Sequence, residues 1–290
     1  MQRKLHPLEG IVAVFALFFV LALSIGFAQA GPAKAQKAVY LRSSSALVLD
    51  ADTGEIVVDK NSDAVTPIAS ITKLMTAMVI LDRALDLEQR IVLSRDDNDS
   101  LKGSHSRLRP GNVLTRGELL LIALMASENR AAAALGRTYP GGMEPFIAAM
   151  NAKAAALDMN DSRFVDPTGL SPHNVSSARD LVKLVRAAHD YSAIREFSTQ
   201  SRATVRVSEK GRPLSFVNTN GLVRGHRWEV GLSKTGYISE AGRCLVMHVR
   251  LASKDLIVVL LDSWGRQSRI GDAQRIKKWV ETNAIAARRS

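Results

Sequence analysis

The position of the strand-forming segments restricts the fold most, because they lie at both ends of the chain with helical segments between them. Near the amino end, Ser45–Asp50 and Glu55–Asp59 flank a turn that ends in Gly54, which predicts an antiparallel hairpin. Aliphatic and β-branched residues return in four later runs, Thr204–Val207, Val230–Tyr237, Cys244–Leu251 and Leu256–Leu261. We therefore expect an α+β fold in which one antiparallel sheet is built from both termini and a mostly helical lobe is inserted between them.

The middle of the chain has the pattern of packed helices. Thr115-Arg116-Gly117-Glu118 fits a capping box, and the apolar run that follows to Met125 predicts a helix buried on all sides. Further helices are expected from Ser70 to about Arg83, from the end of the 126–129 segment to Arg137, from Glu144 to Leu157, from Ser177 to Tyr191 and from Gly271 to Thr282. The polar stretch from Ser94 to Asn112 is expected to be a long loop.

The first 30 residues have the features of an export signal. Arg3 and Lys4 provide a positive start, Ile11–Phe27 is almost entirely apolar, and Ala28-Gln29-Ala30 is a small-residue cleavage site. A retained membrane anchor is the alternative, since the apolar run is close to the roughly 20 residues that span a bilayer. We expect a cleaved signal at 1–30, a flexible lead at 31–43 and one two-lobed domain at 44–290, with no second domain or anchor after it.

Charge and cysteine usage narrow the possible partners. The formal net charge of +11 attracts polyanions, but an exported chain without interleaved aromatic and basic residues is not expected to bind nucleic acid. A carboxylate-rich or membrane-surface partner fits better. Cys244 is the single cysteine, so no intramolecular disulfide forms, and the strand-like run around it predicts a core position. The six histidines lack ligand spacing, and we expect no metal and no cofactor.

Ser70 and Lys73 lie three residues apart at the start of the helical run Pro67–Met78. Positions i and i+3 share a helix face, with Cβ atoms roughly 5–6 Å apart, so a hydroxyl and an amine can meet there. Lysine can take the proton of a serine once burial or another cation lowers its pKa. Because a bare Ser-x-x-Lys also fits an N-cap serine followed by a solvated lysine, the pair needs support from elsewhere in the chain.

Two later segments provide that support. Ser127-Glu128-Asn129 and Lys234-Thr235-Gly236 follow Ser70-Ile71-Thr72-Lys73 in the order found in class A β-lactamases and penicillin-binding proteins. As hypotheses, Lys73 accepts the Ser70 proton with help from the Lys234 charge, and Ser127 relays a proton to the leaving amine.

The remaining positions of these segments are expected to bind substrate. Asn129 can bind a substrate amide, and Lys234 and Thr235 can provide charge and a hydroxyl for a substrate carboxylate. Gly236 leaves the strand edge bare for an extended peptide. The backbone N–H groups of Ser70 and Tyr237 are expected to form the oxyanion hole.

The similarity extends beyond these segments. The chain resembles the low-molecular-mass penicillin-binding proteins of the serine D-Ala-D-Ala peptidase family over roughly Ser44 to Val280, and most of all their periplasmic D-alanyl-D-alanine endopeptidase branch. The resemblance implies a β-lactamase/DD-peptidase-like fold and a Ser70 acyl-enzyme that cuts D-alanyl-diaminopimelate cross-links of peptidoglycan stem peptides. It also implies covalent inhibition by β-lactam antibiotics and a periplasmic location, with membrane contact only through an uncleaved signal. The matching segments are 127–133, 139–142, 146–153, 163–171 and 244–247.

The chain differs at two positions from the carboxypeptidase branch of the family that it resembles. That branch typically has Asn-Arg-Asn before Lys-Thr-Gly, where this chain has Asn218-Thr219-Asn220, and a histidine where Tyr237 stands. Loss of the arginine favours the endopeptidase over a carboxypeptidase that trims stem pentapeptides.

Two further alternatives are a β-lactamase and a non-catalytic wall-binding protein. Class A β-lactamases have a Glu-x-x-Leu-Asn loop after the Ser-x-Asn segment. The corresponding stretch of this chain, Asp166-Pro167-Thr168-Gly169-Leu170, contains no glutamate. Asp166 precedes a proline in a turn, which favours a structural role. Intact Ser70, Lys73 and Lys234 argue against a protein without turnover.

Overall fold

The structure, a computed structural model, describes residues 39–207, 212–225 and 227–287. The predicted signal at 1–30 and most of the predicted lead at 31–43 lie outside these residues. Within the described part, no helix combines the length and the apolar character that crossing a bilayer requires.

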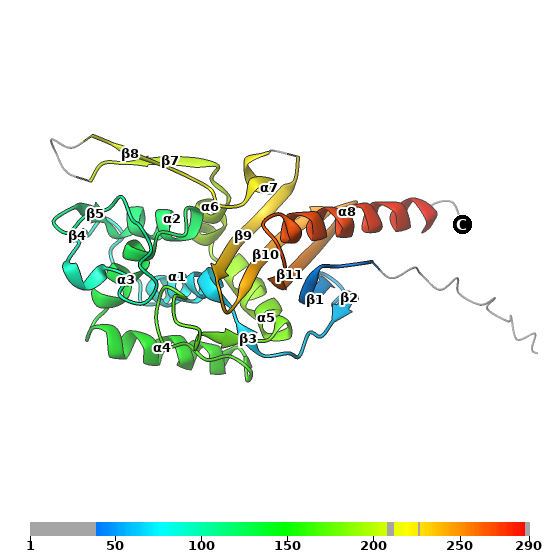
Figure 1. The fold of residues 1–290 in the computed structure, drawn as a ribbon, viewed down its shortest axis with the longest axis horizontal. Helices are drawn as coiled ribbons and strands as arrows, with labels where there is room; N and C mark the ends of the chain where they lie inside the picture. Colours follow the sequence, from blue (N-terminus) through cyan, green and yellow to red (C-terminus); the bar gives the residue numbers. More distant parts are fainter. Residues whose placement is uncertain (1–38, 208–211, 226, 288–290) are drawn as a thin grey trace, which may run out of the picture. The chain divides into compact units, whose positions relative to one another are not determined.

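One five-stranded antiparallel sheet joins strands from the two ends of the described chain (Figure 1). Its strand order is β2-β1-β11-β10-β9. β1 lies beside β11, with Leu47 opposite Val259. The expected sheet built from both termini is therefore confirmed. The strands are β1 (Ser43–Asp50), β2 (Ile56–Lys60), β9 (Glu229–Ile238), β10 (Gly242–Leu251) and β11 (Lys254–Ser263).

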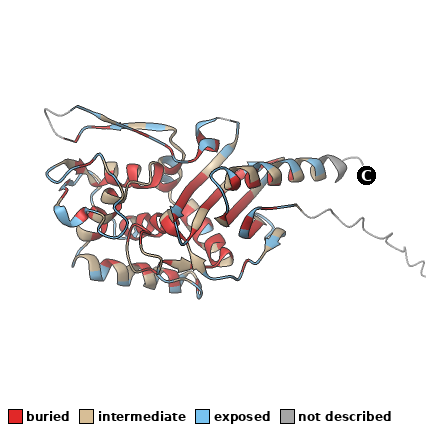
Figure 2. Cartoon of the chain, viewed as in Figure 1, coloured by how far each residue is buried: buried red, intermediate tan, exposed pale blue. Residues whose placement is uncertain are grey.

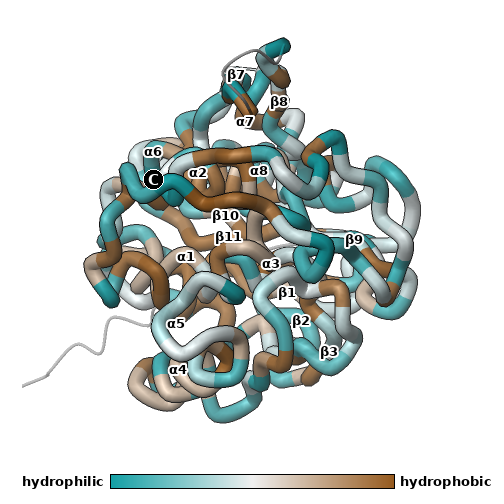
Figure 3. The backbone as a smooth tube through the Cα atoms, turned by 90° about the vertical axis from the view of Figure 1, so that its left-hand side faces the viewer, coloured by the Kyte–Doolittle hydropathy of each residue, from teal (hydrophilic) through white to brown (hydrophobic). Residues whose placement is uncertain are grey.

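The sheet is covered on both faces, which explains why its central strands are apolar at successive positions. In β10, Leu245 and Met247 pack in the core that includes residues of α8 (Ser268–Ala287). The alternate residues Cys244 and Val246 belong to the larger core shared with α1 (Thr72–Asp82) and α5 (Ala178–His189). Figure 2 shows these central strands as buried, and Figure 3 shows the hydrophobic character of β10.

α1 is the central helix of the helical lobe, since every residue from Thr72 to Ile80 is buried. A helix that is apolar around most of its circumference must be surrounded by other elements. The elements around it are α2 (Arg116–Met125), α3 (Asn129–Arg137), α4 (Met143–Ala156) and α6 (Ser192–Thr199). The short elements are η1 (Ala69–Ile71), η2 (Arg95–Asp97), α7 (Gly221–Arg224) and the strand pairs β3 (Thr66–Pro67) with β6 (Val175–Ser176), β4 (Arg90–Val92) with β5 (Val113–Thr115), and β7 (Arg202–Val205) with β8 (Leu214–Val217).

The local predictions are confirmed where a capping signal is present and differ where chain direction changes. The capping box forms: Thr115 Oγ1 accepts from Glu118 N, and Glu118 Oε2 accepts from Thr115 N. The helix expected over 177–191 is confirmed as α5, which ends at His189, and a further helix, α6, follows the extended backbone at Tyr191 and was not predicted. The strand expected over 204–207 begins earlier, as β7, and pairs with β8 in a hairpin that the sequence pattern did not indicate.

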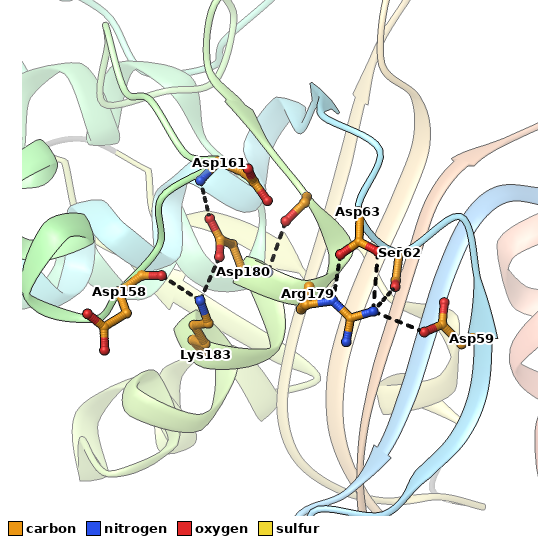
Figure 4. A network of polar contacts seen from close by, with 9 residues as sticks. Asp59, Ser62, Asp63, Asp158, Asp161, Arg179, Asp180 and Lys183 are labelled. Atoms are coloured by element: carbon orange, nitrogen blue, oxygen red, sulfur yellow. Dashed lines mark hydrogen bonds and ion pairs between the residues drawn. The ribbon is translucent and has the colours of Figure 1, made fainter.

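A network of ion pairs fastens the first turn of α5 to its neighbours (Figure 4). The Arg179 guanidinium binds the Asp59 carboxylate at 3.2 Å and the Asp63 carboxylate at 2.6 Å. Asp59 belongs to β2, and Asp63 lies just after it. The Asp180 carboxylate accepts a 2.8 Å hydrogen bond from the backbone N–H of Asp161. Exposed ion pairs contribute at most about 1 kcal/mol each, so their main effect is to orient α5 against the sheet edge.

Candidate active site

Ser70 lies in η1, the short turn that leads into α1, and Lys73 lies one turn further along the same face. The turn is tight, because Ala69 has a φ of +48°, a conformation that costs a non-glycine residue about 1 kcal/mol or more. Lys73 Nζ is 2.9 Å from Ser70 Oγ, to which it donates a hydrogen bond. The predicted meeting of hydroxyl and amine is thus present.

The Lys73 ammonium is buried and held by three acceptors. Besides Ser70, it donates to Asn129 Oδ1 at 2.8 Å and to the carbonyl oxygen of Thr168 at 2.6 Å. Burial lowers the pKa of Lys73 to about 7, and the negative charges of Asp166 and Glu128 oppose this shift only in part. At neutral pH, a large fraction of the molecules therefore carry a neutral amine, as a general base requires.

Ser127 lies in the connection between α2 and α3, and Asn129 is the first residue of α3. Ser127 has a φ of +60°, and Glu128 caps α3 by accepting from Arg130 N. Ser127 Oγ accepts a 2.9 Å hydrogen bond from Lys234 Nζ of β9. The connection therefore links the helical lobe to the sheet at the predicted proton-relay hydroxyl.

Both ends of the Asn129 amide are engaged within the protein. Its Oδ1 accepts from Lys73, and its Nδ2 donates to Ser104 Oγ at 2.9 Å. The oxygen keeps a second lone pair and the nitrogen a second hydrogen, so a substrate amide can bind Asn129, as the sequence predicts, beside these contacts. Ser104 was missed by the sequence analysis, because a serine in a long polar loop carries no signal of its partner.

Lys234 is buried beneath the edge of β9. Its Nζ donates to Ser127 and to the Thr235 carbonyl oxygen, while Thr235 Oγ1 donates to Thr219 Oγ1 at 2.6 Å. Burial holds the pKa of Lys234 well below its ordinary value, and the Lys73 charge lowers it further. The two cations converge as predicted. For Lys73, burial is the cause that lowers the pKa, one of the two causes expected, and the Lys234 charge is not among the causes that act on it.

Gly236 lies so close to the turn that carries Ser70 that no side chain fits between them. A Cβ atom at this position would lie 2.9 Å from the Ile68 carbonyl oxygen and 3.1 Å from Ser70 N. The glycine is therefore needed for close approach of two backbones rather than for a positive φ. This approach brings the strand that carries Tyr237 beside the backbone N–H of Ser70.

The three predicted segments surround one cavity of about 480 Å³. Lys73 and Lys234 lie behind its wall and bind the hydroxyls of Ser70 and Ser127, which face it. The lining residues are Ser70, Lys102, Ser104, Ser127, Asn129, Leu170, Thr219, Thr235, Gly236, Tyr237, Ile238, Ser239 and Arg269.

Arg269, at the beginning of α8, reaches this cavity and was not predicted. Its guanidinium donates to the carbonyl oxygens of Gly236 at 2.8 Å and Cys244 at 3.1 Å. The Cys244 thiol itself is buried, and burial raises its pKa to about 11, which agrees with the predicted core role.

The Asp166 carboxylate is used to shape its own loop. Asp166 Oδ1 accepts from the backbone N–H groups of Thr168 at 2.6 Å and Gly169 at 2.8 Å, and Oδ2 accepts from Asn174 Nδ2 at 2.7 Å. These contacts support the structural interpretation of Asp166, and they hold the Thr168 carbonyl where Lys73 binds it.

Within the described ranges, no three or more His, Cys, Asp or Glu side chains are grouped so that they could hold a metal ion. His189 and His248 stack with ring centroids 3.8 Å apart beside a separate cavity of about 300 Å³. Burial lowers the pKa of both rings, that of His248 to about 4, so the pair is neutral at pH 7.

Comparison with known sequences agrees with this geometry. Residues 32–265 match the peptidase S11 family, described as D-alanyl-D-alanine carboxypeptidase. The chain belongs to this family of serine peptidases. The recognition made from the motifs is therefore confirmed at the family level.

Two relatives and one solved structure place this family member more closely. The D-alanyl-D-alanine endopeptidase of Pseudomonas aeruginosa is 43% identical over 96% of this chain and 90% of its own length. The protein of the same name from Escherichia coli is 43% identical over 94% of this chain and 89% of its own. The Streptomyces K15 DD-transpeptidase superimposes with a TM-score of 0.77 at 26% identity, covering 83% of this chain and 98% of that one. The predicted fold class is thereby confirmed.

Proposed function

We propose that this peptidase is a D-alanyl-D-alanine endopeptidase that hydrolyses the amide between the D-alanine of one peptidoglycan stem and the diaminopimelate of the next. The observation that carries the proposal is the 2.9 Å contact between Ser70 Oγ and a lysine whose pKa is lowered to about 7, at a cavity bordered by an open strand edge. Two relatives that are 43% identical and named endopeptidases support it.

Acylation begins when neutral Lys73 takes the hydroxyl proton of Ser70. Ser70 Oγ then attacks the D-alanine carbonyl carbon, and the carbonyl oxygen becomes an oxyanion held by the backbone N–H groups of Ser70 and Tyr237. Ser127 passes a proton to the diaminopimelate nitrogen, and the proton that Lys73 took from Ser70 replaces it, so that the Lys73 amine is neutral again before deacylation. The C–N bond breaks, the amine leaves, and the D-alanyl group remains as an ester on Ser70.

Deacylation reverses the roles of these groups with water as the nucleophile. A water molecule loses a proton to the Lys73 amine and attacks the ester carbonyl carbon. The carbon–oxygen bond to Ser70 breaks, Ser70 Oγ regains a proton, and a stem with a free carboxylate is released. A β-lactam ring acylates the same oxygen, because its amide carbonyl occupies the same position.

A D-alanyl-D-alanine carboxypeptidase is the second candidate, and Arg269 is the observation that favours it. Thr219, which stands where carboxypeptidases are expected to have an arginine, brings no charge and instead accepts a hydrogen bond from Thr235. Arg269 nevertheless brings a cation to the cavity from α8. The terminal carboxylate of a stem pentapeptide could therefore bind the Arg269 guanidinium in place of the missing arginine.

The proposed location is the periplasm, reached through the export signal at 1–30, and the proposed partner is the peptidoglycan stem peptide. Carboxylate-rich stems match the formal charge of +11.

Digestion of purified dimeric muropeptides, with chromatographic separation of the products, tests the proposal. We expect the parent protein to release monomers, and Ser70→Ala to release none and to lose labelling by a fluorescent penicillin while keeping the same melting temperature. Faster loss of D-alanine from pentapeptides than of cross-links from dimers would establish the carboxypeptidase instead. Cleavage by Ser70→Ala at the parental rate would refute the assigned chemistry.

A further inference from the structure

Three basic side chains at the end of the cavity beside β9, of which Arg269 lines the cavity itself, lack a carboxylate partner among the described residues. Lys234, Arg269 and Arg243 take part in none of the ion pairs found among the described residues. Lys234 and Arg269 bind hydroxyl and carbonyl oxygens, and the Arg243 guanidinium lies 4.5 Å from the centroid of the Tyr237 ring.

These cations also act on one another. After burial, the charge of Arg243 is the largest cause that lowers the pKa of Arg269, and the charge of Arg269 in turn contributes to lowering that of Lys234. Like charges held together in a partly buried cleft oppose each other unless an anion joins them. A ligand with more than one negative charge therefore fits this end of the cleft.

The sheet register separates the positions at which such charges would bind. Tyr237 lies opposite Arg243 on β10, so these two side chains and Thr235 lie on the same face of the sheet. Leu245 lies opposite Thr235, so Arg243, two residues before Leu245 on β10, is the diagonal neighbour of Thr235 at about 7–8 Å.

We propose that Arg243, supported by the Tyr237 ring, binds the second carboxylate of the acceptor stem, while the first carboxylate, next to the cleaved amide, binds at Thr235. This inference rests on the proposed endopeptidase function and names the feature of the leaving group that the cleft selects.

The chemistry of the leaving group matches the spacing. The two carboxyl carbons of diaminopimelate are separated by six bonds, the length of two residues, or about 7 Å when extended. When D-alanine follows the diaminopimelate, its own carboxylate lies one residue further, within reach of a long arginine side chain. Free D-alanine, the leaving group of a carboxypeptidase, has one carboxylate and leaves Arg243 without a ligand.

Tyr237 makes Arg243 suitable for this task. The ring is 56% exposed and lines the cavity, and a guanidinium stacked on an aromatic face keeps its N–H edge free for a bidentate carboxylate. Stacking also limits the rotamers of the arginine before substrate arrives, which reduces the entropy lost on binding.

The test uses the full chain and two synthetic substrates. Each is an acylated donor peptide that ends in D-alanine joined to meso-diaminopimelate, with the remote carboxyl group either free or amidated. We expect amidation to lower kcat/KM roughly tenfold in the parent protein, as loss of one charge-assisted contact does, and less than twofold in Arg243→Gln. Arg243→Lys, which keeps the charge, should retain part of the discrimination.

A matched control separates this effect from general loss of charge. Arg83 is exposed at the far end of α1, and Arg83→Gln should keep the full tenfold discrimination. Melting temperatures show whether each variant is folded, and the rate of acylation by penicillin measures the remainder of the site.

The outcomes are distinguishable. Equal cleavage of both substrates by the parent protein, or the same tenfold discrimination in Arg243→Gln, would overturn the role of Arg243 and leave the endopeptidase function intact. A parent protein that is labelled by penicillin but cleaves neither substrate would overturn the proposed function and this inference with it.

Discussion

The lowered pKa of Lys73 makes a direct prediction about how acylation depends on pH. Burial lowers this pKa from 10.5 to about 7, while the charges of Asp166 and Glu128 raise it by less. The amine is protonated below this pKa and neutral above it, and only the neutral amine can take the Ser70 proton. The rate of acylation should therefore rise with pH through neutrality and then become constant.

The size of the change follows from the fraction of neutral Lys73. With a pKa of about 7, the neutral fraction is about one tenth at pH 6, one half at pH 7 and nine tenths at pH 8. The second-order rate constant for labelling by a fluorescent penicillin should accordingly increase roughly ninefold between pH 6 and pH 8. A lysine with an ordinary pKa would give a rate that continues to rise tenfold per pH unit up to pH 10.

Rapid-quench labelling followed by gel fluorescence measures this rate. Lys73→Arg provides the sharpest control, because arginine keeps the charge but does not lose its proton below pH 12, so labelling should be nearly absent at every pH. Lys234→Arg keeps its charge at all pH values and should retain the inflection near 7 at a lower overall rate. A flat profile from pH 6 to 8, or an active Lys73→Arg variant, would refute Lys73 as the base.

Two further substitutions test the surroundings of the nucleophile. Gly169→Ala places a Cβ atom 2.0 Å from the Ala69 carbonyl oxygen at a φ of +78°, so the free energy of unfolding in urea should fall by about 3 kcal/mol. The control Gly54→Ala has a similar φ of +76° but no atom within 4 Å, so its free energy of unfolding should fall by about 1 kcal/mol. Equal losses in the two variants would contradict the contact at Gly169. Glu128→Gln removes a charge that raises the pKa of Lys73 but keeps the oxygen that caps α3, so the inflection of the pH profile should move to lower pH; movement to higher pH would be inconsistent with that electrostatic contribution.

Much of the site was predictable because its residues lie in short segments with local signals. Ser70 and Lys73 meet through helix geometry, which depends only on their separation in sequence. The contact between Lys234 and Ser127 was not predicted, since no local rule joins residues so far apart. Ser104 and Arg269 lacked local signals as well and were missed.

The errors in the fold have a common physical cause. The helix α6 and the pairing of β7 with β8, neither of which was predicted, depend on which surfaces these segments bury, and that is decided by neighbours distant in sequence. Residue periodicity reports that a segment has an apolar face but not what covers it.

The sequence alone determined the sheet built from both termini and the meeting of Ser70 with Lys73 at the start of one helix, because strand alternation, caps and short motifs act over a few residues. The tertiary structure alone decided the pKa of Lys73, the closeness of Gly236 to Ser70 and the group of cations that includes Arg269 and Arg243. Burial and electrostatic interaction depend on distances through space, and these distances exist only after chain segments far apart in the sequence have packed together.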